Sequence, residues 1–233
     1  MPTSVLPVQS PPGCVEIAVA GERLVLSPFR VAYWPARRTV LVADLHLGKA
    51  DALRFGGSPL SDSVTDGLIE EPLIRLSAAV ATFDAARILV LGDLVHAPVG
   101  LTPRVVSAVT SWRTQCPVGV DLITGNHDTA IHRVAAEWTL GMLGAHASDG
   151  PFDFVHVPPR AGTSTRPWIA GHLHPSIRIG PRSERIPCFA ATDSSLLLPA
   201  FSSFTGGTSD GTRDGQRLYA VTPDRIVPMF ART

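Results

Sequence analysis

The feature that most constrains this chain is a pattern repeated three times between residues 39 and 128. In each repeat, an apolar strand-like run is followed at once by a polar loop; the runs are TVLVA, RILVL and VGVDLIT. Continuous runs rich in β-branched residues are typical of strands that are buried on both faces, as in sheets covered by helices. The repeat therefore predicts an α/β fold in which strands alternate with helices.

Three segments between residues 62 and 143 are predicted to be helical. Thr102 followed by Pro103 is an N-cap with proline at the first helical position, which predicts a helix to about Gln115. Apolar spacing predicts a longer helix over 62–83, kinked or divided at Pro72. A third helix is expected from Thr129 to about Leu143.

The two ends of the chain have a different character. Residues 1–13 are rich in Pro and Ser and are expected to be an ill-ordered tail, followed by short strands over 14–20 and 23–26. Residues 14–233 are expected to form one domain with a β-rich second half. Short apolar runs separated by Pro, Gly and Arg predict its strands: Phe152–Val155, Trp168–Ala170, Ser176–Ile179, Ile186–Phe189, Ser195–Leu198, Leu218–Val221 and Ile226–Met229.

Composition excludes several classes of protein. A hydrophobic content of 45% excludes a disordered chain, and 20 basic against 20 acidic residues exclude a strongly cationic nucleic-acid coat protein. The three cysteines form no CxxC pair, so neither a disulfide framework nor a thiolate metal site is expected. The N-terminus does not resemble a signal peptide, and no apolar run approaches the roughly 20 residues of a membrane span. We expect a cytoplasmic protein without membrane contact.

Seven residues of the metal-ligating types lie at or near strand ends. Residues just past the carboxyl ends of strands converge in one crevice of an α/β sheet. Carboxylate, imidazole and amide oxygen together suit divalent Mn, Fe or Zn. Two ions that share one carboxylate need about three further ligands each, and Asp93 is the natural bridge. His156, in FDFVH, has the weakest context and could instead be an ordinary histidine. The full set is Asp44, His46, Asp93, Asn126, His156, His172 and His174.

The order of these residues carries a resemblance. The motifs D-x-H at 44–46, GD at 92–93, GNHD at 125–128, a lone histidine and GHLH at 171–174 resemble the calcineurin-like metallophosphoesterase superfamily. Over roughly residues 22–207 the chain resembles in particular the bacterial branch called ligase-associated DNA damage response endonuclease. The matching segments are YWP, VADLHLGKA, LGDLVH, GHLHP, PCF and LPAFSSFTGG, and the branch has glycine where this chain has Ser202.

The resemblance implies a two-sheet β sandwich flanked by helices, in α-β-β-α layers, with a dinuclear metal centre. It assigns one ion to Asp44, His46 and His174, the other to Asn126, His156 and His172, and the bridge to Asp93. It places His127 beside the scissile phosphate, with Asp128 orienting its imidazole.

The function implied is that of a metal-dependent phosphodiesterase, a DNA endonuclease linked to DNA repair. A metal-bridging hydroxide would attack phosphorus, and His127 would act as the general acid. Manganese is the expected metal, with iron or zinc as alternatives, and a DNA ligase or helicase is the implied partner. Two other interpretations stay open: hydrolysis of small phosphate esters or nucleotides at the same centre, and a non-catalytic scaffold.

Three further residues are candidates for substrate contact. Lys49 and Arg54 follow the first ligand loop, and His96 lies four residues past Gly92. The interpretation of Lys49 and Arg54 as solvated surface charges is favoured over substrate contact, and His96 is otherwise an ordinary loop histidine.

Overall fold

A computed structural model of the chain describes residues 10–180, 184–205 and 215–229. Its first sheet has seven strands that are neighbours in chain order, and the last four of them are parallel. Paired residues such as Val42 and Val90 fix their register. The strands are β1 (Val15–Val19), β2 (Glu22–Ser27), β3 (Val31–Trp34), β4 (Thr39–Val42), β5 (Arg87–Leu91), β6 (Gly119–Ile123) and β7 (Leu140–Met142).

The second sheet is built from the β-rich second half of the chain. Its strand order is β15-β14-β12-β13-β10-β9-β8, with β11 paired to β12, and β9, β10 and β13 are parallel. Apart from β8, which the sequence pattern does not predict, the bounds agree closely with the runs picked out from sequence. They are β8 (His146–Asp149), β9 (Phe152–Val155), β10 (Trp168–Ala170), β11 (Ser176–Ile179), β12 (Glu184–Ala191), β13 (Ser195–Leu197), β14 (Arg217–Val221) and β15 (Ile226–Met229).

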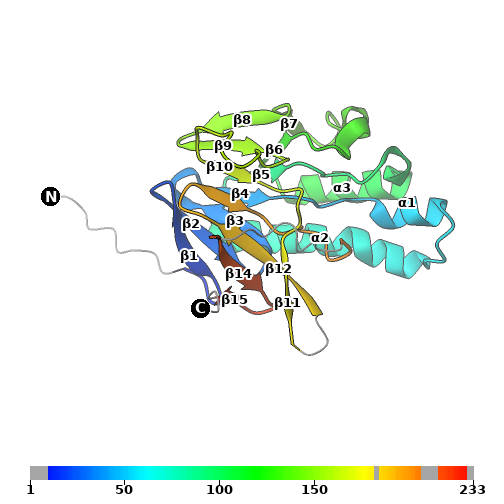
Figure 1. Ribbon diagram of the computed structural model, residues 1–233. Helices are drawn as coiled ribbons and strands as arrows, with labels where there is room; N and C mark the ends of the chain where they lie inside the picture. The colour runs from blue at the N-terminus through cyan, green and yellow to red at the C-terminus, as the bar shows by residue number, and fades with distance from the viewer. Residues whose placement is uncertain (1–9, 181–183, 206–214, 230–233) are drawn as a thin grey trace.

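Three α-helices accompany the first sheet: α1 (Lys49–Phe55), α2 (Asp62–Phe83) and α3 (Pro103–Gln115). The hydroxyls of Ser61 and Thr102 cap α2 and α3 by accepting backbone N–H groups, which satisfies donors that have no partner inside a helix. Helices α2 and α3 lie side by side (Figure 1).

The interior falls into two layers because successive residues of a strand point to opposite faces of its sheet. On one face Val40, Val42 and Val90 pack against helical residues such as Leu73 and Val109. On the other face the intervening residues pack against the second sheet; this group contains Leu24, Leu41, Leu89, Leu91, Phe152, Phe154, Ile169, Phe189 and Leu196. The predicted sandwich of two sheets flanked by helices is confirmed.

One alternative of the prediction is excluded, and one further detail is wrong. Pro72 does not divide α2, because the buried Ile69, Leu73 and Leu76 on either side of it hold the helix on the sheet. The third helix is replaced by a 3-10 turn, Asp128–Arg133, and the short strand β7. Strand pairing to β6 outweighs the local helical pattern there.

The described helices that pack in the hydrophobic core lie against the first sheet. The apolar cluster on the outer face of the second sheet, around Ala170, Ala190 and Leu197, contains no helical residue in the part of the chain that the structure describes. Strands β9 and β10 are joined by the segment 156–167, which contains three prolines and forms turns rather than a crossover helix.

The N-terminal tail predicted for 1–13 lies largely outside the described residues, and Pro11 accepts a hydrogen bond from the Cys14 N–H where the description begins. The cysteines are free thiols, as expected. Among the helices described, none combines the length and the apolar character that crossing a membrane requires.

Candidate metal centre

The candidate ligands converge where the parallel strands of both sheets end. Asp44 and His46 follow β4, Asp93 follows β5, and Asn126 follows β6. The second sheet contributes from its own strand ends: His156 follows β9 directly, and His172 and His174 follow β10. His156, the member with the weakest sequence context, therefore occupies the same type of position as the others.

Four atoms that carry lone pairs meet at His156. Its Nδ1 lies 2.9 Å from the carbonyl oxygen of Leu91, which only accepts, so Nδ1 is the protonated nitrogen and Nε2 presents a lone pair. That Nε2 lies 3.0 Å from Asn126 Oδ1, 3.1 Å from His172 Nδ1 and 3.3 Å from Asp93 Oδ2. A single proton shared at Nε2 could turn one of these three contacts into a hydrogen bond, but it could not do so for all three. A cation among them would satisfy all four atoms.

A second group surrounds Asp44. Its carboxylate is fully buried, and Oδ2 accepts the backbone N–H of His172 at 2.9 Å. Oδ1 accepts no hydrogen bond from any described residue, although His174 Nε2 lies 3.2 Å away. The ligand atoms of Asp44, His46 and His174 all lie within 4.8 Å of one another. A buried anionic oxygen without a donor is costly, and a cation would remove that cost.

Asp93 lies between the two groups. Its Oδ2 is 3.3 Å from His156 Nε2 in the first group and 3.8 Å from His46 Nε2 in the second. Burial lowers the pKa of His46 to about 3, so this imidazole is neutral, as a ligand must be. Burial raises the pKa of Asp93, but the adjacent His156 imidazole and the hydrogen bond from the His127 N–H outweigh it, so the net pKa is lowered and the carboxylate is ionised. The donor set thus fits divalent cations.

The backbone at these ligands is strained. Asp44, His46, Asp93, His172 and His174 have φ values of 58°, 49°, 53°, 71° and 44°. L-residues other than glycine seldom adopt this left-handed region, at a cost of about 1 kcal/mol or more each. Five such residues gathered at one site indicate that ligand geometry, rather than local stability, determines the backbone here.

The glycine of the GD motif is explained by a close approach. Gly92 has a φ of +82°, and a Cβ at this position would lie 2.2 Å from His156 Nδ1. The atom of His156 that bonds Leu91 therefore occupies the space that any side chain at 92 would need.

Gly92→Ala is accordingly expected to displace His156 and to lower metal affinity roughly 10–100-fold, the usual effect of losing the partner that orients a ligating histidine. Metal titration of the purified variant checks this. Gly57→Ala is the matched control, because Gly57 has a φ of +93° with no atom within 4 Å of the added Cβ. Equal affinity in the two variants would contradict the explanation.

The catalytic pair differs from the expectation. Asp128 does not orient the His127 imidazole: its Oδ2 accepts the N–H groups of Asp93 (2.8 Å) and Gly125 (2.9 Å), and its Oδ1 accepts that of Val95 (3.0 Å). The residue is buried and both of its oxygens are occupied. It holds the Asp93 loop to the Gly125 turn, so it is a positioning residue for the candidate bridge.

His96, and not Asp128, supports His127. The His127 Nδ1 lies 2.7 Å from the His96 carbonyl oxygen, and the two rings are stacked with centroids 5.0 Å apart. Both rings lie beside His46, since the nitrogens of these three histidines fall within 4.8 Å of one another. His96 is therefore brought to the site.

The two basic candidates behave differently. Lys49 begins α1 next to the ligand loop, its ammonium 6.0 Å from the ring centroid of Phe204, and burial lowers its pKa. Arg54 is instead paired with Asp62 at 2.5 Å, away from the ligands. The structure brings Lys49 near the site and does not bring Arg54 there.

Sequence reasoning missed the support of the Asp44 loop. The N–H groups of Phe201 and Ser202 donate to the carbonyls of Ala43 (2.9 Å) and Asp44 (3.2 Å). Arg30 donates a hydrogen bond to the Ser202 carbonyl, and Arg75 donates one to the Phe201 carbonyl. The Arg75 guanidinium also stacks on the Phe201 ring. The LPAFSSF segment was the available signal, but its residue types suggest no such role.

Comparison with solved structures gives one informative likeness. The chain is similar to nuclease MPE of Pseudomonas putida, with a TM-score of 0.78 and 33% identity, covering 93% of this chain and 100% of that one. Two more distant structures, both 14% identical, bear on neither fold nor function: the phosphoesterase Yfce of E. coli (TM-score 0.44, 81% of this chain and 96% of that one) and a protein of unknown function from Aquifex aeolicus (0.39, 58% and 78%).

No protein-family model matches the chain, and no curated protein matches it. The likeness to the nuclease nevertheless spans its full length and includes the two-sheet fold that carries the clustered histidines and aspartates. The chain belongs to the calcineurin-like metallophosphoesterase superfamily, whose members are metal-dependent phosphoesterases.

Proposed function

We propose that this chain is a dinuclear, manganese-dependent phosphodiesterase that cleaves DNA as an endonuclease of DNA repair in the cytoplasm. The observation that carries the proposal is the meeting of four lone-pair atoms at His156, beside the unbonded oxygen of Asp44. The similarity to a nuclease over the whole of its length supports DNA as the substrate. A DNA ligase or helicase as partner follows from the family resemblance alone.

The ligands divide into two sets in this proposal. Asp44, His46 and His174 would hold one ion, Asn126, His156 and His172 would hold the other, and Asp93 would serve both. When bound, the two ions supply Lewis acidity, which offsets charge on the phosphate oxygens and makes water a nucleophile near neutral pH.

His127 gives the leaving group its proton. Its Nδ1–H donates to the His96 carbonyl, so Nε2 is the ring nitrogen left for proton transfer. An imidazole suits this role because histidine is the side chain that most often transfers protons in catalysis. The backbone N–H of His127 donates to Asp93 Oδ1 at 2.9 Å, which ties the acid to the candidate bridge.

The test is metal-dependent hydrolysis. We expect two ions per chain by elemental analysis, loss of activity with a chelator, and recovery with Mn²⁺ on bis-p-nitrophenyl phosphate and on DNA. Fe²⁺ and Zn²⁺ are the alternative metals for the same assay. Circular plasmid DNA distinguishes an endonuclease, which nicks it, from an exonuclease, which leaves it intact.

Other outcomes would favour the other functions. Hydrolysis of p-nitrophenyl phosphate or nucleotides without cleavage of DNA would favour a small-ester phosphoesterase. If no ester is hydrolysed with any of the three metals, the proposed activity is wrong and the scaffold interpretation stands.

A further inference from the structure

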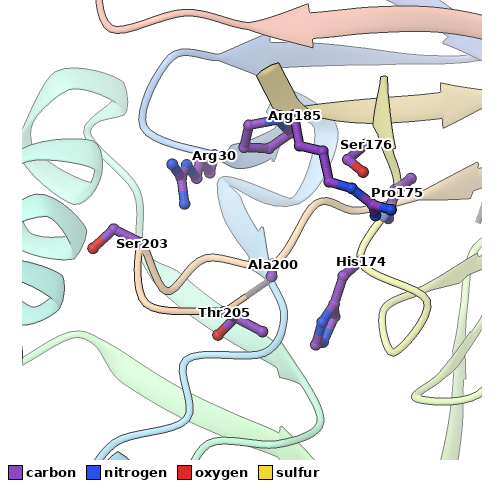
Figure 2. Close-up of a pocket in the computed structure, with 9 residues that line it drawn as sticks. Arg30, His174, Pro175, Ser176, Arg185, Ala200, Ser203 and Thr205 are labelled. Carbon is purple, nitrogen blue, oxygen red and sulfur yellow. The ribbon is translucent and has the colours of Figure 1, made fainter. Parts of the chain in front are cut away.

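A pocket of about 210 Å³ adjoins the candidate metal centre and is not used by the proposed mechanism. Figure 2 shows Arg30, Ser176, Arg185 and Thr205 around it, with His174 at its lower edge. Arg30 comes from the turn between β2 and β3, Ser176 and Arg185 come from the β11–β12 hairpin, and Thr205 comes from the loop after β13. Three separate parts of the fold therefore build this pocket.

Two residues that line the pocket have hydroxyls with no hydrogen-bond partner in the described part of the chain. Ser176 is only 3% exposed, and neither its Oγ nor the Oγ1 of Thr205 hydrogen-bonds to any described residue. Buried polar groups in native proteins are almost always bonded, so two such hydroxyls around one pocket call for a partner beyond the described residues. The hydroxyl is a donor to an anionic oxygen as readily as an acceptor.

The charge of the wall indicates what that partner is. Two guanidinium groups line the pocket, and no carboxylate does so among the described residues. Arg30 is held in place because its Nη1 donates to the Ser202 carbonyl at 2.9 Å, while burial lowers its pKa. Arginine and hydroxyl donors together are the usual ligands of phosphate.

The location relates the pocket to the reaction. His174 belongs to the Asp44 group, where its Nε2 lies 3.2 Å from Asp44 Oδ1. The same histidine also lines the pocket. An anion in the pocket would thus be separated from the candidate centre by one imidazole. A nucleic-acid strand presents just such a series of phosphates, one after another.

We propose that this pocket binds the phosphodiester next to the scissile one, with Arg185, Arg30 and the Ser176 hydroxyl as its donors. The proposal rests on the proposed function above and deepens it. The enzyme selects substrates with a second phosphate on one side of the cleaved bond, which distinguishes a nucleic-acid strand from an isolated diester.

The test uses dinucleotides that differ only in a terminal phosphate. Wild-type protein with Mn²⁺ is given TpT, pTpT and TpTp, and kcat/KM is measured for cleavage of the internucleotide bond in each. We expect one of the two phosphorylated forms to be preferred over TpT by about tenfold or more, the usual effect of hydrogen bonds to a charged group. Which of the two is preferred gives the strand polarity.

Variants locate the preference. Arg185→Gln and Ser176→Ala should reduce it to near unity while leaving kcat/KM for TpT within about threefold. Arg178→Gln is the matched control. Arg178 lies opposite Arg185 in the hairpin but does not line the pocket, so this substitution removes the same charge without changing the pocket wall. Calorimetric titration of metal-free protein with pTpT and TpTp should show the same loss of binding in the two pocket variants only.

The failures are distinguishable. Equal kcat/KM for the three dinucleotides, or a preference that Arg178→Gln removes as fully as Arg185→Gln, would overturn the pocket and leave the phosphodiesterase standing. Absence of cleavage of all three and of bis-p-nitrophenyl phosphate would overturn the proposed function and the subsite with it. A thermal melting curve of Ser176→Ala checks that this variant is folded, since removing a buried hydroxyl that has no partner among the described residues should not destabilise the fold.

Discussion

His127→Ala is expected to lower kcat for DNA by about 10²–10⁴-fold while leaving the metal content unchanged. The side chain supplies the proton for the leaving alkoxide, and alanine supplies none. The link between residue 127 and Asp93 is made by the backbone N–H, which donates to Asp93 Oδ1 at 2.9 Å and is kept in the variant. Steady-state kinetics together with elemental analysis of the same sample measure both quantities.

The leaving group provides a sharper control. p-Nitrophenolate departs without a proton, so the same variant should lose far less activity on bis-p-nitrophenyl phosphate than on DNA. His96→Ala is the matched variant, because it removes the stacked ring but keeps the carbonyl that accepts from His127 Nδ1. Loss of bound metal in His127→Ala, or equal losses on both substrates, would refute the role of general acid.

Asp128→Ala is expected to lower the free energy of unfolding by about 3–5 kcal/mol, which is a large share of the roughly 5–15 kcal/mol typical of a domain. Three backbone N–H groups, those of Asp93, Val95 and Gly125, donate to this buried carboxylate and would lose their acceptor. Urea denaturation of the metal-free protein measures the change without any contribution from bound ions.

Asp128→Asn separates the hydrogen bonds from the volume of the side chain. Asparagine keeps one acceptor oxygen but turns an NH₂ group toward at least one of the three donors, so an intermediate loss of about 1–3 kcal/mol is expected. Asp193→Asn is the control, because the Asp193 side chain is 97% exposed and its ion pair with Arg217 adds little. A loss in Asp128→Ala no larger than in this control would show that the loop is held by other contacts.

Much of the fold could be predicted from local pattern. The strands of the second half other than β8 were found because each apolar run is short and bounded by Pro, Gly or Arg, and α3 was found from the Thr102–Pro103 start. The segment 129–143 was misassigned because its helical spacing of apolar residues competes with pairing of β7 to β6, which sequence alone does not reveal.

The candidate centre was more accessible, because its ligands are of special residue types and follow strand ends in a fixed order. What could not be predicted is the set of main-chain contacts that hold them. The role of Asp128 depends on three N–H groups from two loops, and that of the LPAFSSF segment depends on carbonyls at 43 and 44. Backbone groups are the same in every residue, so such partners leave no trace in the sequence.

At the five ligands with left-handed backbone, stability and activity favour different residues. Glycine adopts this conformation at almost no steric cost, whereas aspartate and histidine do not. Selection for thermal resistance of the metal-free protein alone would therefore favour glycine at 44, 46, 93, 172 and 174, and every such gain would remove a ligand. Directed evolution for heat tolerance would therefore have to leave these five positions unchanged. Stabilising substitutions are better sought away from this edge of the two sheets.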